Sequence, residues 1–210
     1  ICGVSGVDNR TLNRSIRDLG SRRALLTDAA TSLEEGLERL NHDSLPRNAV
    51  SRVSVPGIRE FPAESEKFHV VAVDCGMKRN IIRSFLKRNC RVTVVPWNTP
   101  ADRIASLQPD GLFISNGPGD PADVPSTVAA VRQMIGRIPI FGICLGHQII
   151  ALAYGAKTYK LKFGHRGGNH PVRDLETGRI EITSQNHSYA VDPDSLRDTP
   201  LVISHLNLLD

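Results

Sequence analysis

Residues 138–154 read IPIFGICLGHQIIALAY, and this stretch decides the fold. Residues 138–144 form an apolar run of strand length, and residues 146–154 repeat their apolar positions at helical spacing. Cys144 is therefore expected at the junction between a strand and a helix. In open α/β sheets, such junctions at the carboxyl ends of strands hold active sites.

The sequence before this junction alternates between short apolar runs and amphipathic segments. Such runs are expected to form buried strands, and segments with helical periodicity are expected to form helices. The alternation predicts an α/β fold with an open, mostly parallel sheet flanked by helices. The expected strands are residues 70–73, 92–95 and 111–114, and the expected helices are residues 81–86 and 128–135.

The two ends of the chain have a different character. Residues 11–19 and 32–40 resemble short helices, and Pro46, Pro56 and Pro62 interrupt this region. Residues 157–163, 179–183 and 201–205 resemble short strands separated by polar turns. A cluster of Pro, Glu and Ser at residues 62–67 predicts a boundary between residues 1–66 and a sheet domain at residues 67–210. Because the first residue is not Met, we expect a fragment of a longer polypeptide. The strand pattern stops at Asp210, so we expect the sheet domain to be truncated at its C-terminus.

Composition excludes several classes of protein. No apolar run reaches bilayer length, and no secretion signal is recognisable, so we expect a cytoplasmic protein without a membrane partner. The net charge is only +4, and acidic residues interleave with the basic ones of residues 10–59, which argues against a nucleic-acid partner. The cysteines show neither CxxC pairs nor zinc-finger histidines, so we expect no metal site and no disulfide framework. They are Cys2, Cys75, Cys90 and Cys144.

Cys144 carries the pattern of a nucleophile. Glycines lie two residues before and after it, at Gly142 and Gly146, which is the spacing of the nucleophile elbow of serine hydrolases. A strand that turns at once into a helix crowds the flanking backbone, and glycine tolerates that crowding because it lacks a Cβ. The helix N-terminus would also favour the thiolate. A buried cysteine without chemistry is the alternative, and the two glycines argue against it.

A glycine loop, SNGPGDP at residues 115–121, follows the strand expected at residues 111–114. It would lie at the same edge of the sheet as Cys144. Such a loop can direct backbone N–H groups at a developing oxyanion, with the N–H of Leu145 as a second donor. An ordinary Pro-Gly turn is the alternative for the loop taken by itself.

Together, GICLGHQ at residues 142–148 and the loop at residues 115–121 resemble the class I, or triad, glutamine amidotransferases. Further stretches resemble the glutaminase region, or small subunit, of carbamoyl-phosphate synthetases. DCGMK at 74–78 and VVPW at 94–97 are more similar to the eukaryotic enzymes of pyrimidine synthesis than to bacterial small subunits. The other stretches are GVDNRTL at 6–12, KFGHRGGNHP at 162–171 and SQNH at 184–187.

The resemblance implies a site and a reaction. Cys144 would attack the side-chain amide of glutamine, and the backbone N–H groups of Gly117 and Leu145 would form the oxyanion hole. A thioester would then be hydrolysed to glutamate. The residues that the resemblance assigns to glutamine binding are Gly117, Gly119, Leu145, Gln148, Asn186, Ser188 and Tyr189. Residues 1–66 would be the C-terminal part of the small-subunit N-terminal domain with its linker.

The same resemblance implies a partner. Ammonia would pass to a synthetase subunit, or to a fused synthetase domain, that makes carbamoyl phosphate from bicarbonate and ATP for pyrimidine or arginine biosynthesis. The sequence has neither a GxxxxGK[ST] loop nor a GxGxxG after a first strand. We therefore expect no cofactor in this chain, and we expect ATP and Mg²⁺ on the synthetase.

The sequence departs from the family pattern in three ways. The family takes its catalytic histidine and an orienting glutamate from a segment similar to PEASPGPHD, which is absent here, so a poor catalyst is expected. Ser188 stands where the family usually has glycine, and a positive φ would strain it. An earlier small-subunit segment that contributes a serine near glutamine is also absent. None of the histidines after residue 124 matches the catalytic motif: His147, His165, His170, His187 and His205.

Two other functions stay open from the sequence. A non-catalytic regulatory or interaction domain could keep the amidotransferase fold without turnover, although an intact Cys144 between two glycines argues against it. The glutaminase of another amidotransferase, of the anthranilate or guanylate type, would keep the cysteine elbow. It would not have the region at residues 6–17, which favours the carbamoyl-phosphate interpretation.

Overall fold

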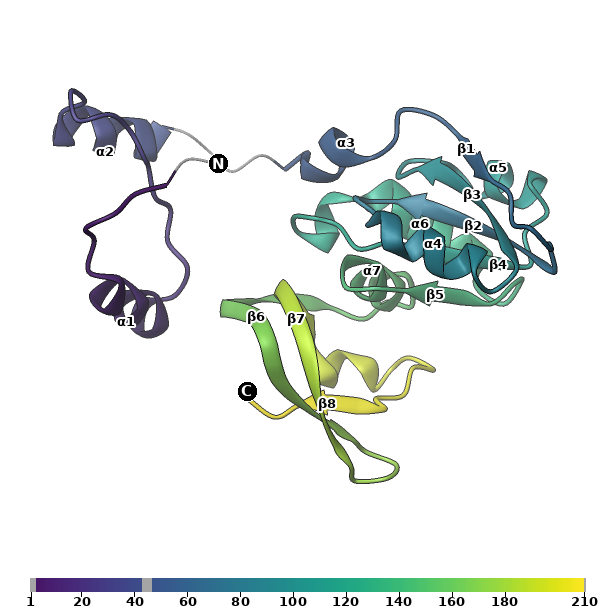
Figure 1. Ribbon diagram of the computed structural model, residues 1–210. Helices are drawn as coiled ribbons and strands as arrows, with labels where there is room; N and C mark the ends of the chain where they lie inside the picture. Colours follow the sequence, from purple (N-terminus) through teal and green to yellow (C-terminus); the bar gives the residue numbers. More distant parts are fainter. Residues whose placement is uncertain (1–2, 43–46, 210) are drawn as a thin grey trace.

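The computed structural model describes residues 3–42 and 47–209; Cys2 and Pro46 lie outside these ranges. A five-stranded sheet with the order β1-β3-β2-β4-β5 forms its centre (Figure 1). β1 pairs antiparallel with β3, and all the other pairs are parallel, so the mostly parallel sheet is confirmed. The strands are β1 (Arg59–Phe61), β2 (Phe68–Asp74), β3 (Cys90–Pro96), β4 (Gly111–Ile114) and β5 (Ile140–Gly142).

The order of the strands creates a switch point between β2 and β4. From β2 the chain crosses to β3 on one side, and it then returns to build β4 and β5 on the other side. Connections leaving the carboxyl ends of β2 and β4 therefore run in opposite directions and leave a crevice between them. The helices that connect the strands are α4 (Arg79–Leu86), α5 (Ala101–Ser106), α6 (Pro125–Met134) and α7 (Leu145–Ala153).

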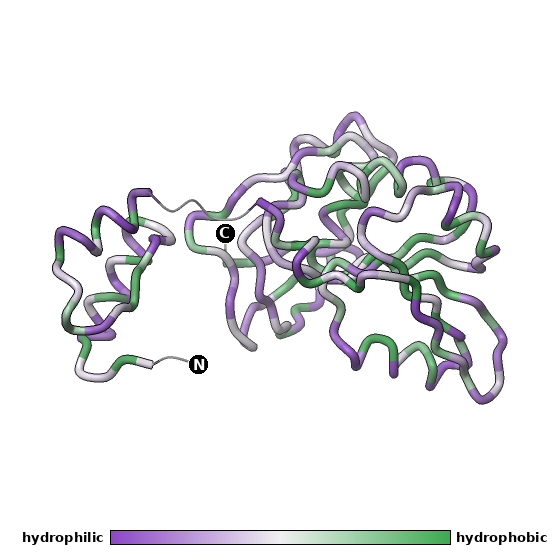
Figure 2. Tube along the Cα trace, turned by 90° about the horizontal axis from the view of Figure 1, so that it is seen from above, coloured by the Kyte–Doolittle hydropathy of each residue, from purple (hydrophilic) through white to green (hydrophobic). Residues whose placement is uncertain are grey.

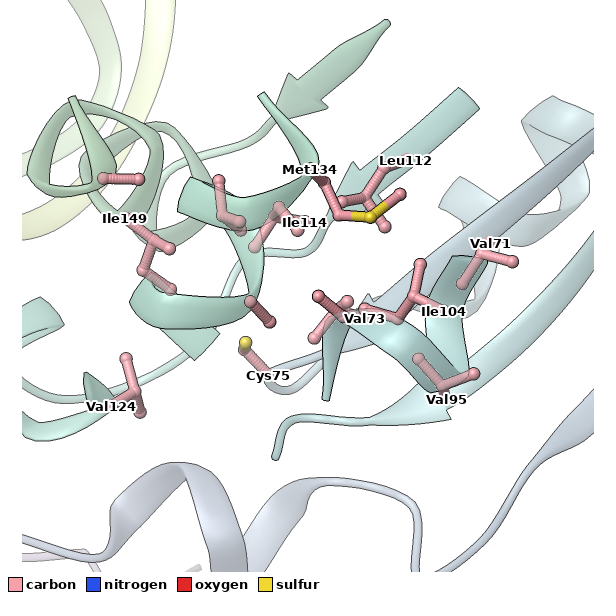
Figure 3. Packing of buried hydrophobic residues seen from close by; sticks show 14 of the residues in the cluster. Val71, Val73, Cys75, Val95, Ile104, Leu112, Ile114, Val124, Met134 and Ile149 are labelled. Carbon is pink, nitrogen blue, oxygen red and sulfur yellow. The ribbon is translucent and has the colours of Figure 1, made fainter. Parts of the chain in front are cut away.

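Alternate residues of the strands point to opposite faces of the sheet, and each face has its own core. Val71 and Val73 face a cluster that includes Ile104 of α5, Met134 of α6 and Ile149 of α7 (Figure 3). The opposite face packs on α4 through a smaller cluster. Burial on both faces explains why these strands are nearly continuous apolar runs in the sequence. Figure 2 shows hydrophobic and hydrophilic residues alternating along most of the tube.

A second sheet follows α7. It has the order β7-β6-β8, with β6 (Thr158–Asp174), β7 (Ile180–Val191) and β8 (His205–Asn207), all antiparallel. β6 and β7 are much longer than the expected strands, because two register shifts bend the ladder without ending it. The strand expected at residues 201–205 begins only at His205. Short 3₁₀ helices span Pro121–Asp123 and Pro193–Leu196.

Three helices precede the central sheet: α1 (Asn9–Leu19), α2 (Leu33–His42) and α3 (Ala49–Val53). The carboxylate of Asp8 caps α1 by accepting from the Thr11 N–H at 3.0 Å. Val50 of α3 is buried in the core of the central sheet. The division at residue 66 stays a prediction, although α3 and the edge strand β1 already pack with the sheet.

We expect Ile149→Ala to lower the free energy of unfolding by about 2–5 kcal/mol, because Ile149 is fully buried between α7 and the sheet. Urea unfolding followed by circular dichroism measures the change. Val202→Ala is the matched control, since Val202 is 89% exposed and its truncation should change stability by less than about 0.5 kcal/mol. Equal effects of the two substitutions would contradict the packing of α7.

Candidate active site

Cys144 lies at the apex of a sharp turn between β5 and α7. Its backbone has φ 54° and ψ −109°, a combination that non-glycine residues rarely adopt. The residue caps the N-terminus of α7. Strained backbone of this kind persists where the surrounding structure enforces it, and the two flanking glycines permit the close backbone contacts that do so.

Both glycines are sterically required. A Cβ on Gly142 would lie 2.5 Å from the carbonyl carbon of Gly146, and a Cβ on Gly146 would lie 2.1 Å from the carbonyl oxygen of Ile114. Both contacts are with backbone, which cannot move aside as a side chain can. The expected crowding at the turn is therefore present, and it includes the neighbouring strand β4 as well as the elbow itself.

The strand β7 forms one wall beside Cys144. The sulfur of Cys144 lies 3.8 Å from the carbonyl oxygen of Asn186. The side-chain amide of Gln148 donates to the carbonyl oxygen of Tyr189 at 2.6 Å, which ties α7 to the same wall. Residues 144–148 and 186–189 thus meet, and their assignment to glutamine binding stays a prediction of the family resemblance.

The glycine loop also contacts the start of α7. A Cβ on Gly117 would lie 2.2 Å from the carbonyl oxygen of Cys75 and 2.7 Å from Cδ2 of Leu145, so the loop packs against the first residue of α7. Gly119 adopts a φ of 93°, which only glycine tolerates easily. Burial, followed by the neighbouring carboxyl group of Asp120, raises the pKa of Tyr189. The loop and β7 therefore also meet each other.

Ser188 is accommodated without strain. Among the described residues, the non-glycine positions with positive φ are Asn89, Gln108 and Cys144, so Ser188 has ordinary strand geometry. Its hydroxyl accepts from the guanidinium of Arg166 at 2.6 Å. A serine at this position is compatible with the wall beside Cys144.

The resting state of the thiol differs from the expectation. Burial raises the pKa of Cys144 above its ordinary value, and the N–H of Leu145 only partly opposes this shift. The expected preference for the thiolate is thus wrong for the resting protein, because desolvation outweighs the helix N-terminus. Burial, followed by the charge of Asp74, raises the pKa of Cys75 to about 12, so Cys75 stays a thiol.

Sequence reasoning missed a polar network behind the β7 wall. His187 lies 2.9 Å from the carbonyl oxygen of Tyr189 through Nδ1, and 3.0 Å from Oε1 of Gln185 through Nε2. The same Nε2 lies 3.2 Å from Nδ1 of His165, and Asn207 of β8 donates to Gln185 at 3.0 Å. His165, Gln185 and His187 fall in stretches that carry the family resemblance, whereas Asn207 does not, so no sequence signal indicated the network as a whole. His187 therefore supports the wall from behind.

Residues 3–42 and 47–209 contain no group of three or more His, Cys, Asp or Glu side chains that could hold a metal ion. None of their helices combines the length and apolar character needed to cross a bilayer. His147 and His205 are exposed, on α7 and β8 respectively, and His170 is buried in β6.

Comparison with known proteins identifies the architecture. The model of the class-I glutamine amidotransferase family matches residues 71–210, which include the elbow, the glycine loop and β7. The chain belongs to this family. A solved structure from Thermoplasma acidophilum, described as part of a GMP synthase, shares the amidotransferase fold with a TM-score of 0.55 and 21% identity. The alignment covers 67% of this chain and 73% of that one.

Some relatives align with the whole length of this chain. The carbamoyl phosphate synthase small chain of Staphylococcus epidermidis is 49% identical over 210 residues, which are 100% of this chain and 57% of that protein. The small chain of Listeria innocua is also 49% identical, with the same coverage. This chain thus spans a little over half the length of these relatives. Both relatives are bacterial, and the eukaryotic lineage stays a prediction.

We expect Gly146→Ala to destabilise the protein by about 3 kcal/mol or more, because the added Cβ would collide with the backbone of Ile114. Thermal and urea unfolding measure the loss. Gly168→Ala serves as the control, since a Cβ there meets nothing within 4 Å. A Gly146→Ala protein as stable as the parent would show that α7 and β4 are not in backbone contact.

We expect the alkylation rate of Cys144 by iodoacetamide to rise with pH, with a midpoint above that of a free cysteine. A raised pKa leaves little thiolate at neutral pH, and the thiolate is the reacting form. Mass spectrometry of the digested protein follows each cysteine, and Cys75 should stay unmodified in the folded protein. A midpoint below that of free cysteine would mean that the helix N-terminus outweighs burial.

Proposed function

We propose that this chain carries the glutamine-hydrolysing site of a carbamoyl-phosphate synthetase. The observation that carries the proposal is the position of Cys144, on a glycine-flanked elbow between the glycine loop and the wall at Asn186. The family membership and the relatives named as small chains support it. A cytoplasmic location accords with this role.

The reaction would proceed through a thioester. The Cys144 thiol gives its proton to a base, and the resulting thiolate attacks the side-chain amide carbon of glutamine, so that a carbon–sulfur bond forms and the electrons of the carbonyl π bond move to oxygen. The N–H groups of Gly117 and Leu145 stabilise this oxyanion. When the oxyanion collapses, the carbon–nitrogen bond breaks and ammonia leaves after accepting a proton. Water then cleaves the thioester to glutamate and restores the thiol.

The walls of the site would determine what it binds. Gln148 is buried and hydrogen-bonded to β7, so its side chain holds the wall and the helix at a fixed separation. Backbone carbonyl and N–H groups at residues 186–189 and in the loop would contact the polar ends of glutamine. Protonation of the ammonia and activation of the water need an acid–base group, and the family resemblance assigns this role to a histidine–carboxylate pair.

Ammonia would be consumed by a synthetase partner. The proposal places ATP, Mg²⁺ and bicarbonate on that partner, either as a separate protein or as a fused domain. Free ammonia would otherwise be lost to water, so delivery requires direct contact between the two proteins. Mixing this chain with the purified synthetase and measuring glutamine-dependent carbamoyl phosphate formation tests this part of the proposal.

We expect a diazo-ketone analogue of glutamine to modify Cys144 selectively. The sulfur displaces N₂ from the analogue and forms a thioether, which mass spectrometry of the digested protein locates. Excess glutamine should slow the labelling at Cys144 and should leave Cys90 unaffected, since Cys90 lies on β3, away from the site. Asparagine, which is one methylene shorter, should protect poorly.

Cys144→Ser is the control variant, and it should take up no label at residue 144. Equal labelling of Cys2, Cys75 and Cys90, with no protection by glutamine, would contradict a formed glutaminase pocket. The non-catalytic alternative would then be favoured.

A further inference from the structure

The oxyanion donor of the glycine loop belongs to a peptide group whose orientation is fixed from its other side. The N–H of Gly117 and the carbonyl of Asn116 are parts of one planar peptide, and they point in opposite directions because the peptide is trans. Any contact that holds the Asn116 carbonyl therefore also sets the direction of the Gly117 N–H. Within the described ranges, that N–H has no hydrogen-bond acceptor of its own.

The contact that holds this carbonyl is the hydroxyl of Ser115. Ser115 is fully buried at the end of β4. Its oxygen accepts from the backbone N–H of Cys75 at 2.8 Å. Its single proton is donated to the carbonyl oxygen of Asn116, also at 2.8 Å. Because the N–H of Cys75 can only donate, the direction of the hydroxyl proton is determined.

The Cys75 N–H, at the other end of this hydrogen-bond chain, belongs to a turn that Asp74 stabilises. The carboxylate of Asp74 accepts from the N–H groups of Gly76 at 2.9 Å and Met77 at 2.7 Å, which fixes the turn after β2. It also accepts from the N–H of Val55 at 2.8 Å. The side-chain amide of Asn116 donates to the Gly76 carbonyl at 3.0 Å and links the loop to this turn a second time.

The turn and the loop lie on the two sides of the β2/β4 switch point. Gly117 packs so closely on the Cys75 carbonyl that a Cβ would lie 2.2 Å from it. The same glycine packs on Leu145, the residue that follows the nucleophile. The glycine loop thus packs between the turn after β2 and α7. The Ser115 hydroxyl is hydrogen-bonded to the Asn116–Gly117 peptide of this loop.

We propose that Ser115 is a positioning residue of the glutaminase site, whose buried hydroxyl orients the Asn116–Gly117 peptide so that its N–H faces the oxyanion formed at Cys144. The inference rests on the proposed glutamine hydrolysis. Ser115 does not touch glutamine in this arrangement. It acts chiefly on the tetrahedral state, because the Gly117 N–H bonds a charged oxyanion much more strongly than the oxygen of an uncharged amide.

The aldehyde that corresponds to glutamine, with –CHO in place of the side-chain amide, tests the inference without turnover. Its carbonyl carbon bonds to the Cys144 sulfur, the π electrons move to oxygen, and the thiol proton is transferred to that oxygen or to solvent. The dissociation constant of this adduct reports on the oxyanion hole. Glutamine binding to Cys144→Ala proteins, measured by ligand-observed NMR, reports on the ground state.

We expect Ser115→Ala to weaken the aldehyde adduct by about 10- to 100-fold, since loss of a single oxyanion donor costs about 100-fold or more in rate. Glutamine affinity should not change in the Cys144→Ala background. Ser115→Thr retains the hydroxyl and should recover the adduct to within about threefold of the parent. Thr127→Val is the matched control, since Thr127 is an equally buried hydroxyl that donates to the Trp97 carbonyl at 2.6 Å, away from the site.

The outcomes separate the two proposals. Absence of any adduct in the parent protein would overturn the glutaminase function and the role of Ser115 with it. An adduct that is as stable in Ser115→Ala as in the parent, or equal losses of aldehyde and glutamine affinity, would overturn the positioning role alone. If Ser115→Ala does not fold, Asp74→Asn takes its place. In this variant an amide donor can face the Val55 N–H, which would disturb the turn that carries the Cys75 N–H. An adduct as stable as that of the parent would count against the inference.

Discussion

The close approach of α7 to β4 is the contact on which the rest of the site depends. Gly146 lies directly against the carbonyl of Ile114, so a helix and a strand meet through their backbones without intervening side chains. This contact forces the turn at Cys144 into its unusual backbone conformation. It also brings the loop that follows β4 to the first turn of α7. The geometry of the nucleophile and of its oxyanion donors thus comes from one contact.

Much of the central sheet could be predicted, because β2, β3 and β4 are largely buried on both faces and appear as uninterrupted apolar runs. The expected strand at residues 111–114 coincides with β4. The edge strand β1 was missed, since it has three residues and its first two, Arg59 and Glu60, are exposed. The helix α5 has six residues and was missed for its shortness. β6 was expected to end at residue 163, because the glycines at its register shift break the alternation of the strand.

The candidate site also has features that local sequence predicts and features that it does not. Cys144 and the glycine loop are local motifs whose steric reasons can be deduced from a few residues. The contact between Tyr189 and Asp120, and the network around His187, join segments that are far apart in the chain, so no local pattern indicates them. The state of the Cys144 thiol was predicted wrongly for the same reason: β7 adds burial that the sequence around the elbow does not contain.

The separation of Cys144 from Asn186 has a consequence for biosynthesis. The two residues lie 42 positions apart in the chain. At typical translation speeds, roughly 2–8 s pass between the synthesis of the nucleophile and that of the wall that covers it. During this interval a nascent chain carries the elbow cysteine without β7, and its thiol is more exposed to oxidants than in the finished fold. The order of the elements along the gene therefore leaves the nucleophile uncovered until β7 has been made.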